Sequence, residues 1–142
     1  MLLVMNWTLA GLGTPGSEYV GTRHNVGREF LIALERSASW RISPKTKILL
    51  PDTYMNNSGR AFAKFSTSKK AAEHLVVLHD DLDLPLGGVK ISFSSGSGGH
   101  KGVESIQKTL KTKDFARIRI GISPTTPGGK LKKPDSNKVN DF

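Results

Sequence analysis

Residues 74–85 read HLVVLHDDLDLP, a run of branched apolar residues that leads directly into an acidic cluster. Residues 74–78 predict a buried strand, because a short continuous apolar run is typical of a strand covered on both faces of its sheet. The cluster at residues 79–83 follows that strand. Ligands of open α/β sheets bind at the carboxyl ends of strands, so a functional site is expected here.

Strand and helix patterns alternate on both sides of this segment. Apolar runs at residues 7–12 and 47–50 predict two further strands, and apolar–polar alternation at 88–94 and 115–122 predicts two half-buried ones. Helices are expected at residues 25–35, from a cap at Asp52 or Thr53 to Phe65, and near residues 103–110. This order predicts the α/β class, with a single domain and a twisted mixed, largely parallel sheet flanked by helices.

Length and composition fit one folded unit of 142 residues. We expect residues 1–123 to form the catalytic domain and residues 124–142, rich in Pro, Gly and Lys, to form a mobile or extended tail. The net charge of +9 favours a polyanionic partner such as a nucleic acid. Absence of cysteine excludes a disulfide framework and a thiolate metal site. The apolar opening is too short for a membrane span and lacks a cationic start, so we expect a soluble cytoplasmic protein. We also expect the chain to be a monomer.

Three polar segments follow predicted strands, at residues 13–25, 79–83 and 94–101, and are expected to meet at one edge of the sheet. A histidine beside a carboxylate is a general base with a fixed tautomer, and His24 and Asp80 are the candidates. The chain has no G-x-S-x-G elbow and no cysteine, which favours direct attack by water over an acyl-enzyme. The four histidines show no metal-ligand spacing, so we predict no metal.

Each signal also has a structural interpretation. The GTPG stretch at residues 13–16 is by itself typical of a turn. His24 lies near the start of a predicted helix, a position that is also typical of a residue in the helix-cap region. His79 ends an apolar strand and is expected to be structural. The acidic cluster is suited to a divalent cation, although such carboxylates are more often solvated or capping. Six basic residues between Lys101 and Arg119, against two acidic ones, predict a phosphate-facing surface.

Taken together and in this order, the segments resemble the bacterial-type peptidyl-tRNA hydrolase family. The resemblance spans about residues 7–123, and several separate motifs in register are far more specific than any one of them. The matching stretches are residues 11–16 (GLGTPG), 21–27 (GTRHNVG), 53–59 (TYMNNSG), 79–87 (HDDLDLPLG), 98–102 (GGHKG) and 117–122 (RIRIGI).

The family cleaves the ester that joins a peptide to the 3′-terminal ribose of tRNA, so the resemblance implies a hydrolase of peptidyl-tRNA that needs no cofactor. It would make His24 the base that activates water and Asp80 the residue that orients this base. Asn56 would hold the substrate and help to keep His24 in place. The other positions implied to bind substrate or tRNA are Thr14, Tyr19, Lys90, His100, Lys101 and Arg119.

Two of these positions depart from the family pattern, because Thr14 and Lys101 stand where members usually have asparagine. Threonine keeps a hydroxyl but loses the two donors of the amide, and lysine supplies only donors and a charge. The stretch between the first helix and residue 47 also lacks a strand that members usually carry. If this shortening is genuine, an uncovered edge or core face of the sheet is expected.

A non-catalytic RNA-binding relative, such as a splicing or ribosome-associated factor, is the main alternative. Thr14, Lys101 and the basic tail suit it, whereas retention of His24, Asp80 and Asn56 favours the enzyme. A nucleotide- or cofactor-binding domain has less support, because no complete phosphate-loop motif is present.

Overall fold

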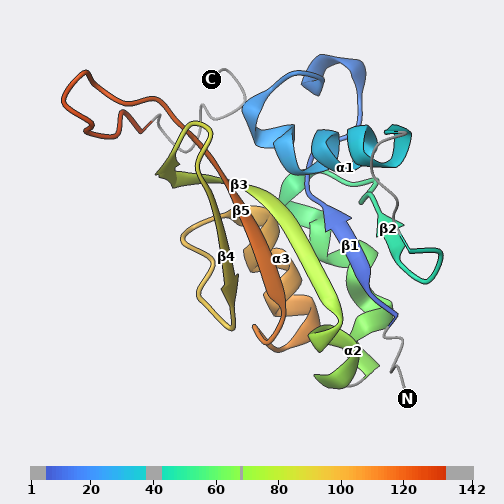
Figure 1. Cartoon of the computed structure of the whole chain (residues 1–142). Helices are drawn as coiled ribbons and strands as arrows, with labels where there is room; N and C mark the ends of the chain where they lie inside the picture. The colour runs from blue at the N-terminus through green and yellow to red at the C-terminus, as the bar shows by residue number, and fades with distance from the viewer. Residues whose placement is uncertain (1–5, 38–42, 68, 134–142) are drawn as a thin grey trace.

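A computed structural model describes residues 6–37, 43–67 and 69–133 (Figure 1). Five strands form one sheet in the order β2-β1-β3-β5-β4, in which only the β4–β5 pair is antiparallel. The strands are β1 (Thr8–Gly11), β2 (Lys47–Leu49), β3 (Leu75–Pro85), β4 (Val89–Phe93) and β5 (Ala116–Ser123). The predicted α/β class and the mixed, largely parallel sheet are confirmed.

Helices cover the two faces of this sheet unequally (Figure 1). One face carries α1 (Val26–Arg36), which contacts β1 and β3. The other face carries the 3-10 helix η3 (Met55–Thr67) and α3 (Lys101–Leu110), which pack against each other. The short helical segments are η1 (Ser17–Tyr19), η2 (Arg23–Asn25) and α2 (Lys69–Glu73).

The main hydrophobic core lies between the sheet and the pair formed by η3 and α3. Ala10 and Val77 are register partners on β1 and β3, so their side chains point to the same face. They pack with Phe62 of η3 and with Val103 and Ile106 of α3, all fully buried. This packing fixes the amino-terminal end of α3 beside the sheet.

On the opposite face, α1 approaches β3 at Gly27. A Cβ atom at this position would lie 2.2 Å from the backbone oxygen of Leu78, a distance that no real side chain tolerates. Only glycine therefore permits this contact. Because α1 follows η2 directly, the same approach brings η2 to the carboxyl half of β3.

Two predicted elements have different bounds in the structure. The acidic cluster lies within β3 and not in a loop after it, because β5 continues to pair with β3 as far as Asp81 and Gly121 before the register shifts. The helix predicted from Asp52 or Thr53 begins at Met55. Thr53 does not act as its cap, since its hydroxyl is buried without a hydrogen-bond partner.

The half burial predicted for the strand at residues 88–94 is wrong, and one large apolar residue of α1 is also exposed. This residue is Phe30, which lies at helical spacing with the other apolar residues of α1. Val89, Ile91 and Phe93 alternate along β4 as predicted, yet they are 57–73% exposed, because no described helix covers this face at the edge of the sheet. An uncovered face was expected, although its position on β4 was not.

The carboxyl-terminal segment leaves β5 and forms one isolated bridge, between Thr125 and Leu131. The predictions for residues 1–5 and 134–142 lie outside the described residues. Over the ranges that the structure describes, none of the helices has the length and apolar character needed to cross a membrane.

Candidate active site

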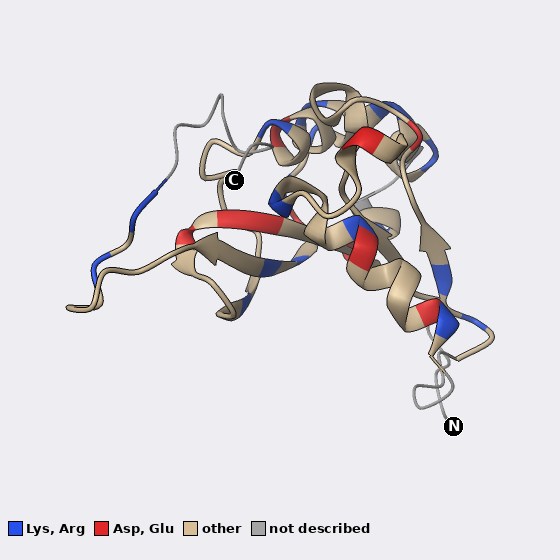
Figure 2. Ribbon diagram, turned by 90° about the horizontal axis from the view of Figure 1, so that it is seen from above, with Lys and Arg blue, Asp and Glu red and all other residues tan. Residues whose placement is uncertain are grey.

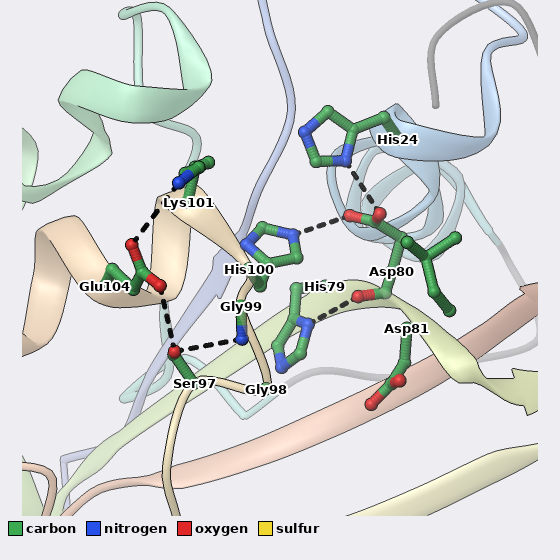
Figure 3. A pocket seen from close by; sticks show the side chains of 11 residues that line it. His24, His79, Asp80, Asp81, Ser97, Gly98, Gly99, His100, Lys101 and Glu104 are labelled. Carbon is green, nitrogen blue, oxygen red and sulfur yellow. Dashed lines mark hydrogen bonds and ion pairs between the residues drawn. The ribbon is translucent and has the colours of Figure 1, made fainter. Parts of the chain in front are cut away.

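Three segments that are far apart in the sequence meet at the carboxyl half of β3 (Figure 3). η2 supplies His24, β3 supplies Asp80, and His100 is the residue that caps the amino terminus of α3. They surround a crevice of about 390 Å³. Its lining also includes His79, Asp81, Leu82, Ser97, Gly98, Gly99, Lys101 and Glu104.

The His24 ring is bound to the carboxylate of Asp80, with His24 Nδ1 lying 2.7 Å from Asp80 Oδ2. The Asp80 side chain is 3% exposed and that of His24 is 16% exposed. A carboxylate only accepts hydrogen bonds, so Nδ1 carries the proton and Nε2 is left with its lone pair. Figure 3 shows this second nitrogen directed away from Asp80. His24 is thus held in the tautomer that a general base requires.

His100 binds the other oxygen of the same carboxylate. Its Nε2 lies 2.7 Å from Asp80 Oδ1, while its Nδ1 accepts the backbone N–H groups of Gly102 and Val103 at 3.1 and 3.2 Å. Because Nδ1 is an acceptor, the proton must be on Nε2, which donates to Asp80. Both nitrogens of His100 are therefore engaged, and the ring acts as a fixed donor.

Two opposing effects set the pKa of Asp80. Burial alone would raise it, but the adjacent His100 and His24, both hydrogen-bonded to the carboxylate, hold the pKa well below its ordinary value. Asp80 is therefore ionised throughout the pH range in which proteins work. An ionised carboxylate stabilises the imidazolium that forms when His24 accepts a proton.

A second buried pair lies behind the carboxylate. His79 Nδ1 donates to the backbone oxygen of Asp80 at 2.7 Å, and His79 Nε2 accepts from the Arg117 guanidinium at 3.2 Å. Burial chiefly, with further contributions from the neighbouring His100 and Arg117, lowers the pKa of His79 to about 3. His79 is thus neutral near pH 7. Arg117 lies in the alternating segment predicted at residues 115–122, but it was not among the predicted site residues.

Of the nine predicted site residues, four line the crevice: His24, Asp80, His100 and Lys101. Lys101 is exposed at its edge, with its amine 4.0 Å from Glu104. Thr14 and Tyr19 line a separate pocket of about 260 Å³.

Asn25, the residue after His24, joins the Thr14 loop to η2. Its side-chain oxygen accepts from Thr14 N at 2.7 Å and its amide donates to Thr14 O at 2.8 Å. Asn25 lies in the predicted polar segment at residues 13–25 and in the matching stretch 21–27, although no role was predicted for it.

The remaining three predicted residues lie outside both pockets. Lys90 and Arg119 are register partners on β4 and β5, so they share one face of the sheet. Arg119 Nε lies 2.5 Å from Asp81 Oδ2. Asn56 is exposed at the start of η3. The adjacent Met55 packs near Gly102 at the amino terminus of α3.

His24, Asp80 and His100 also form a possible set of metal ligands, because their ligating atoms lie within 4.8 Å of one another. Both nitrogens nearest the carboxylate are hydrogen-bonded to it directly, at 2.7 Å. A cation would need its own bonds of about 2.0–2.2 Å to each ligand in place of these contacts. The arrangement is better suited to proton transfer.

The chain is similar in sequence and in shape to peptidyl-tRNA hydrolases. The sequence profile described as "Peptidyl-tRNA hydrolase" matches residues 8–135. The peptidyl-tRNA hydrolase of Thermodesulfovibrio yellowstonii is 45% identical over 131 residues, covering 80% of this chain and 70% of the relative. That of Aquifex aeolicus is 45% identical over 130 residues, covering 80% and 68%. The crystal structure of the Acinetobacter baumannii peptidyl-tRNA hydrolase superposes with a TM-score of 0.71 at 33% identity, covering 95% of this chain and 81% of that one.

Proposed function

The chain belongs to the peptidyl-tRNA hydrolase family, and from this premise we propose how it cleaves the ester bond between peptide and tRNA. His24 is the base that activates water, and Asp80 orients and stabilises it. One observation carries this assignment: a solvent-accessible His24 ring is bound through Nδ1 to a buried, ionised carboxylate at the edge of a crevice. That arrangement leaves Nε2 available to take a proton from water.

The reaction balances with these two residues and one water molecule. Water attacks the ester carbonyl carbon as its proton passes to His24 Nε2, and the resulting imidazolium is stabilised by Asp80. Collapse of the tetrahedral intermediate breaks the bond between the carbonyl carbon and the ribose oxygen. The ribose oxygen takes the proton back from His24, so the products are a peptide with a free carboxyl group and a tRNA with a free 3′-hydroxyl.

The other predicted residues are proposed to hold the substrate. Lys101 and His100 line the crevice beside the base, and Lys101 offers a cation to a carbonyl or phosphate oxygen. Thr14 and Tyr19 line the neighbouring pocket. Asn56, exposed beside the amino terminus of α3, is proposed to contact the substrate once it is bound.

Contacts with the tRNA backbone are assigned to Lys90 and Arg119. The support is their shared face of the sheet and the net charge of +9, which favours a polyanion. Figure 2 shows Lys and Arg distributed over several elements, including β4 and β5, and not gathered in one helix. A long nucleic acid is the kind of ligand that such dispersed charges can contact together.

We further propose that residues 1–123 carry this activity and that the chain works as a monomer in the cytoplasm. All three groups of the hydrogen-bonded cluster come from a single chain, which supports action as a monomer. A role in translation and a sequence without cysteine support the compartment. The alternative of a non-catalytic RNA-binding relative is not favoured, because the base and its carboxylate are both in place.

Release of peptide from a labelled peptidyl-tRNA tests the proposal. We expect turnover by the wild type and a loss of at least about a hundredfold in kcat for His24→Ala, the usual contribution of a general base. Circular dichroism checks that the variant is folded. A wild type that binds tRNA with steep salt dependence but releases no peptide would establish the RNA-binding alternative.

A further inference from the structure

Arg117 is a buried arginine behind the crevice whose contacts are not explained by substrate binding. It lies on β5 and is 3% exposed. Its guanidinium donates to Ser95 Oγ at 2.5 Å, to the Gly96 carbonyl at 2.6 Å and to His79 Nε2 at 3.2 Å. All three acceptors are uncharged, so burial of this cation costs free energy that only well-directed hydrogen bonds offset. Burial accordingly lowers the pKa of Arg117.

One arm of Arg117 holds the loop that forms a wall of the crevice. Ser95 and Gly96 come directly before the crevice-lining part of this loop. That part consists of Ser97, Gly98 and Gly99, and it leads into His100. Gln107 of α3 holds the same turn from the other side, donating to the Ser95 carbonyl at 3.0 Å. The loop that leads into His100 is therefore anchored to both the sheet and the helix.

The other arm reaches the histidine cluster through His79. Donation by Arg117 to His79 Nε2 requires the His79 proton to be on Nδ1, where it donates to the Asp80 backbone carbonyl. The His79 ring meets the His100 ring edge-on, with ring centroids 4.7 Å apart. His100 in turn donates to the Asp80 carboxylate. Arg117 is thus connected through His79 to both the backbone and the side-chain surroundings of Asp80.

We propose that Arg117 is a positioning residue for hydrolysis: by fixing the Ser95–Gly96 turn and His79, it fixes His100 and the Asp80 carboxylate that orients His24. The inference rests on the proposed function of the His24–Asp80 pair. The contacts of Arg117 are with Ser95, Gly96 and His79, and it is not among the residues that line the crevice. Its effect is therefore expected on the chemical step and not on binding.

Steady-state hydrolysis of a labelled peptidyl-tRNA by Arg117→Gln and Arg117→Lys provides the test. We expect kcat to fall about ten- to a hundredfold in Arg117→Gln, as displacement of catalytic groups by about 1 Å does elsewhere, while KM stays within about twofold. Arg117→Lys should be impaired too, since an ammonium lacks the planar fork that serves three acceptors. Arg60→Gln, which removes an exposed arginine from η3, is the matched control and should match the wild type.

Imidazole nitrogen NMR gives a readout that general destabilisation would not produce. The wild type should show single tautomers, protonated at Nδ1 in His79 and at Nε2 in His100, and Arg117→Gln should shift both rings. If the Arg117 variants do not fold, Ser95→Ala removes only one acceptor and should lower kcat severalfold and shift the His100 signals. Gln107→Met, which loosens the loop without touching His79, should shift His100 but leave the His79 tautomer intact.

Some results would overturn the positioning role. The positioning role is ruled out if kcat and the imidazole signals are unchanged in Arg117→Gln. If Arg117→Gln does not fold, the same result in Ser95→Ala rules it out. A raised KM with unchanged kcat and reduced salt dependence would make Arg117 a tRNA contact instead. Failure of the proposed function looks different, because the wild type would then release no peptide. The ring tautomers still decide the positioning role in that case.

Discussion

His100 Nε2 lies 2.7 Å from Asp80 Oδ1, so a second histidine shares the carboxylate to which His24 is bound. Both rings donate, because the remaining nitrogen of His100 caps a helix and that of His24 faces away from Asp80. An ionised carboxylate has no donor and accepts hydrogen bonds on both of its oxygens, whereas a protonated one would place an O–H on one of them. The cluster therefore depends on the charge of Asp80 and on its two equivalent oxygens.

Asp80→Asn should lower kcat by about 10²–10⁴-fold with little change in KM. The amide offers one acceptor, so it can satisfy His24 or His100 but not both, and its NH₂ group favours the wrong His24 tautomer. Peptide release and CD spectra measure activity and folding. Asp83→Asn makes the same change on an exposed residue of β3 and should retain full activity. An Asp80→Asn enzyme with half of the wild-type kcat would mean that His24 acts without its carboxylate.

The buried His79 should make the protein less stable as the pH falls. Above pH 6.5 the ring is neutral in both states; below it, the unfolded chain gains a proton that the folded protein does not accept until about pH 3. As the pH falls through this window, the free energy of unfolding should therefore decrease, and its slope should approach about 1.4 kcal/mol for each pH unit. Asp80, whose pKa is lowered from 3.8, adds to the loss only below about pH 4.

Urea unfolding between pH 4.5 and 7.5 measures this slope. His79→Gln should flatten the slope even if it lowers stability at pH 7, because it removes the group that takes up the proton. His74→Gln, outside the hydrophobic core, is the matched control and should keep the wild-type slope. If wild type and His79→Gln show equal slopes of the free energy of unfolding against pH, the proton taken up on unfolding binds to a group other than His79.

Lys90 and Arg119 should differ in their contribution to tRNA binding although they are register partners. Lys90→Gln should reduce the slope of log Kd against log salt concentration by about 1, the change expected for one lost phosphate contact. Arg119→Gln should reduce it less, because Asp81 already neutralises Arg119. Filter binding of tRNA over a range of salt concentrations measures both slopes. A larger effect of Arg119 would mean that its ion pair with Asp81 opens when tRNA binds.

Gly27→Ala should destabilise the fold by about 1–3 kcal/mol, since the added methyl group meets the Leu78 backbone. It should also reduce kcat, because α1 can accommodate the methyl only by moving away from β3, which carries the adjoining His24 away from Asp80. Thermal unfolding and peptide release measure the two effects. Gly128→Ala, where the nearest atom to an added Cβ is 3.9 Å away, should change neither. An unaffected Gly27→Ala protein would mean that the α1–β3 contact is loose.

Much of this arrangement follows from local sequence patterns. The alternation at residues 115–122 places Arg117 and Arg119 on one face, and the apolar run before Asp80 predicts that the carboxylate follows the buried part of a strand. Position along the sheet brings together side chains that follow neighbouring strands. These regularities account for the fold class and for the presence of His24, Asp80 and His100 in one place.

Long-range packing set the features that the sequence did not predict. Periodicity cannot tell that Arg117 is covered by the Ser95–Gly96 turn while Arg119, two residues on, remains partly exposed. Nor can it show that β5 extends the pairing of β3 through the acidic cluster. The exposure of Phe30 likewise depends on which elements lie opposite its helix.

The apolar row of Val89, Ile91 and Phe93 affects how the protein behaves at high concentration. An edge strand with free backbone groups and exposed apolar side chains is a template for pairing with another copy. Mutual repulsion between molecules of charge +9 opposes that encounter, and salt weakens the repulsion. Raising the ionic strength should thus release tRNA and bring protein molecules together at the same time. On the proposed function, colloidal stability and substrate affinity would share one electrostatic origin, the net charge of +9.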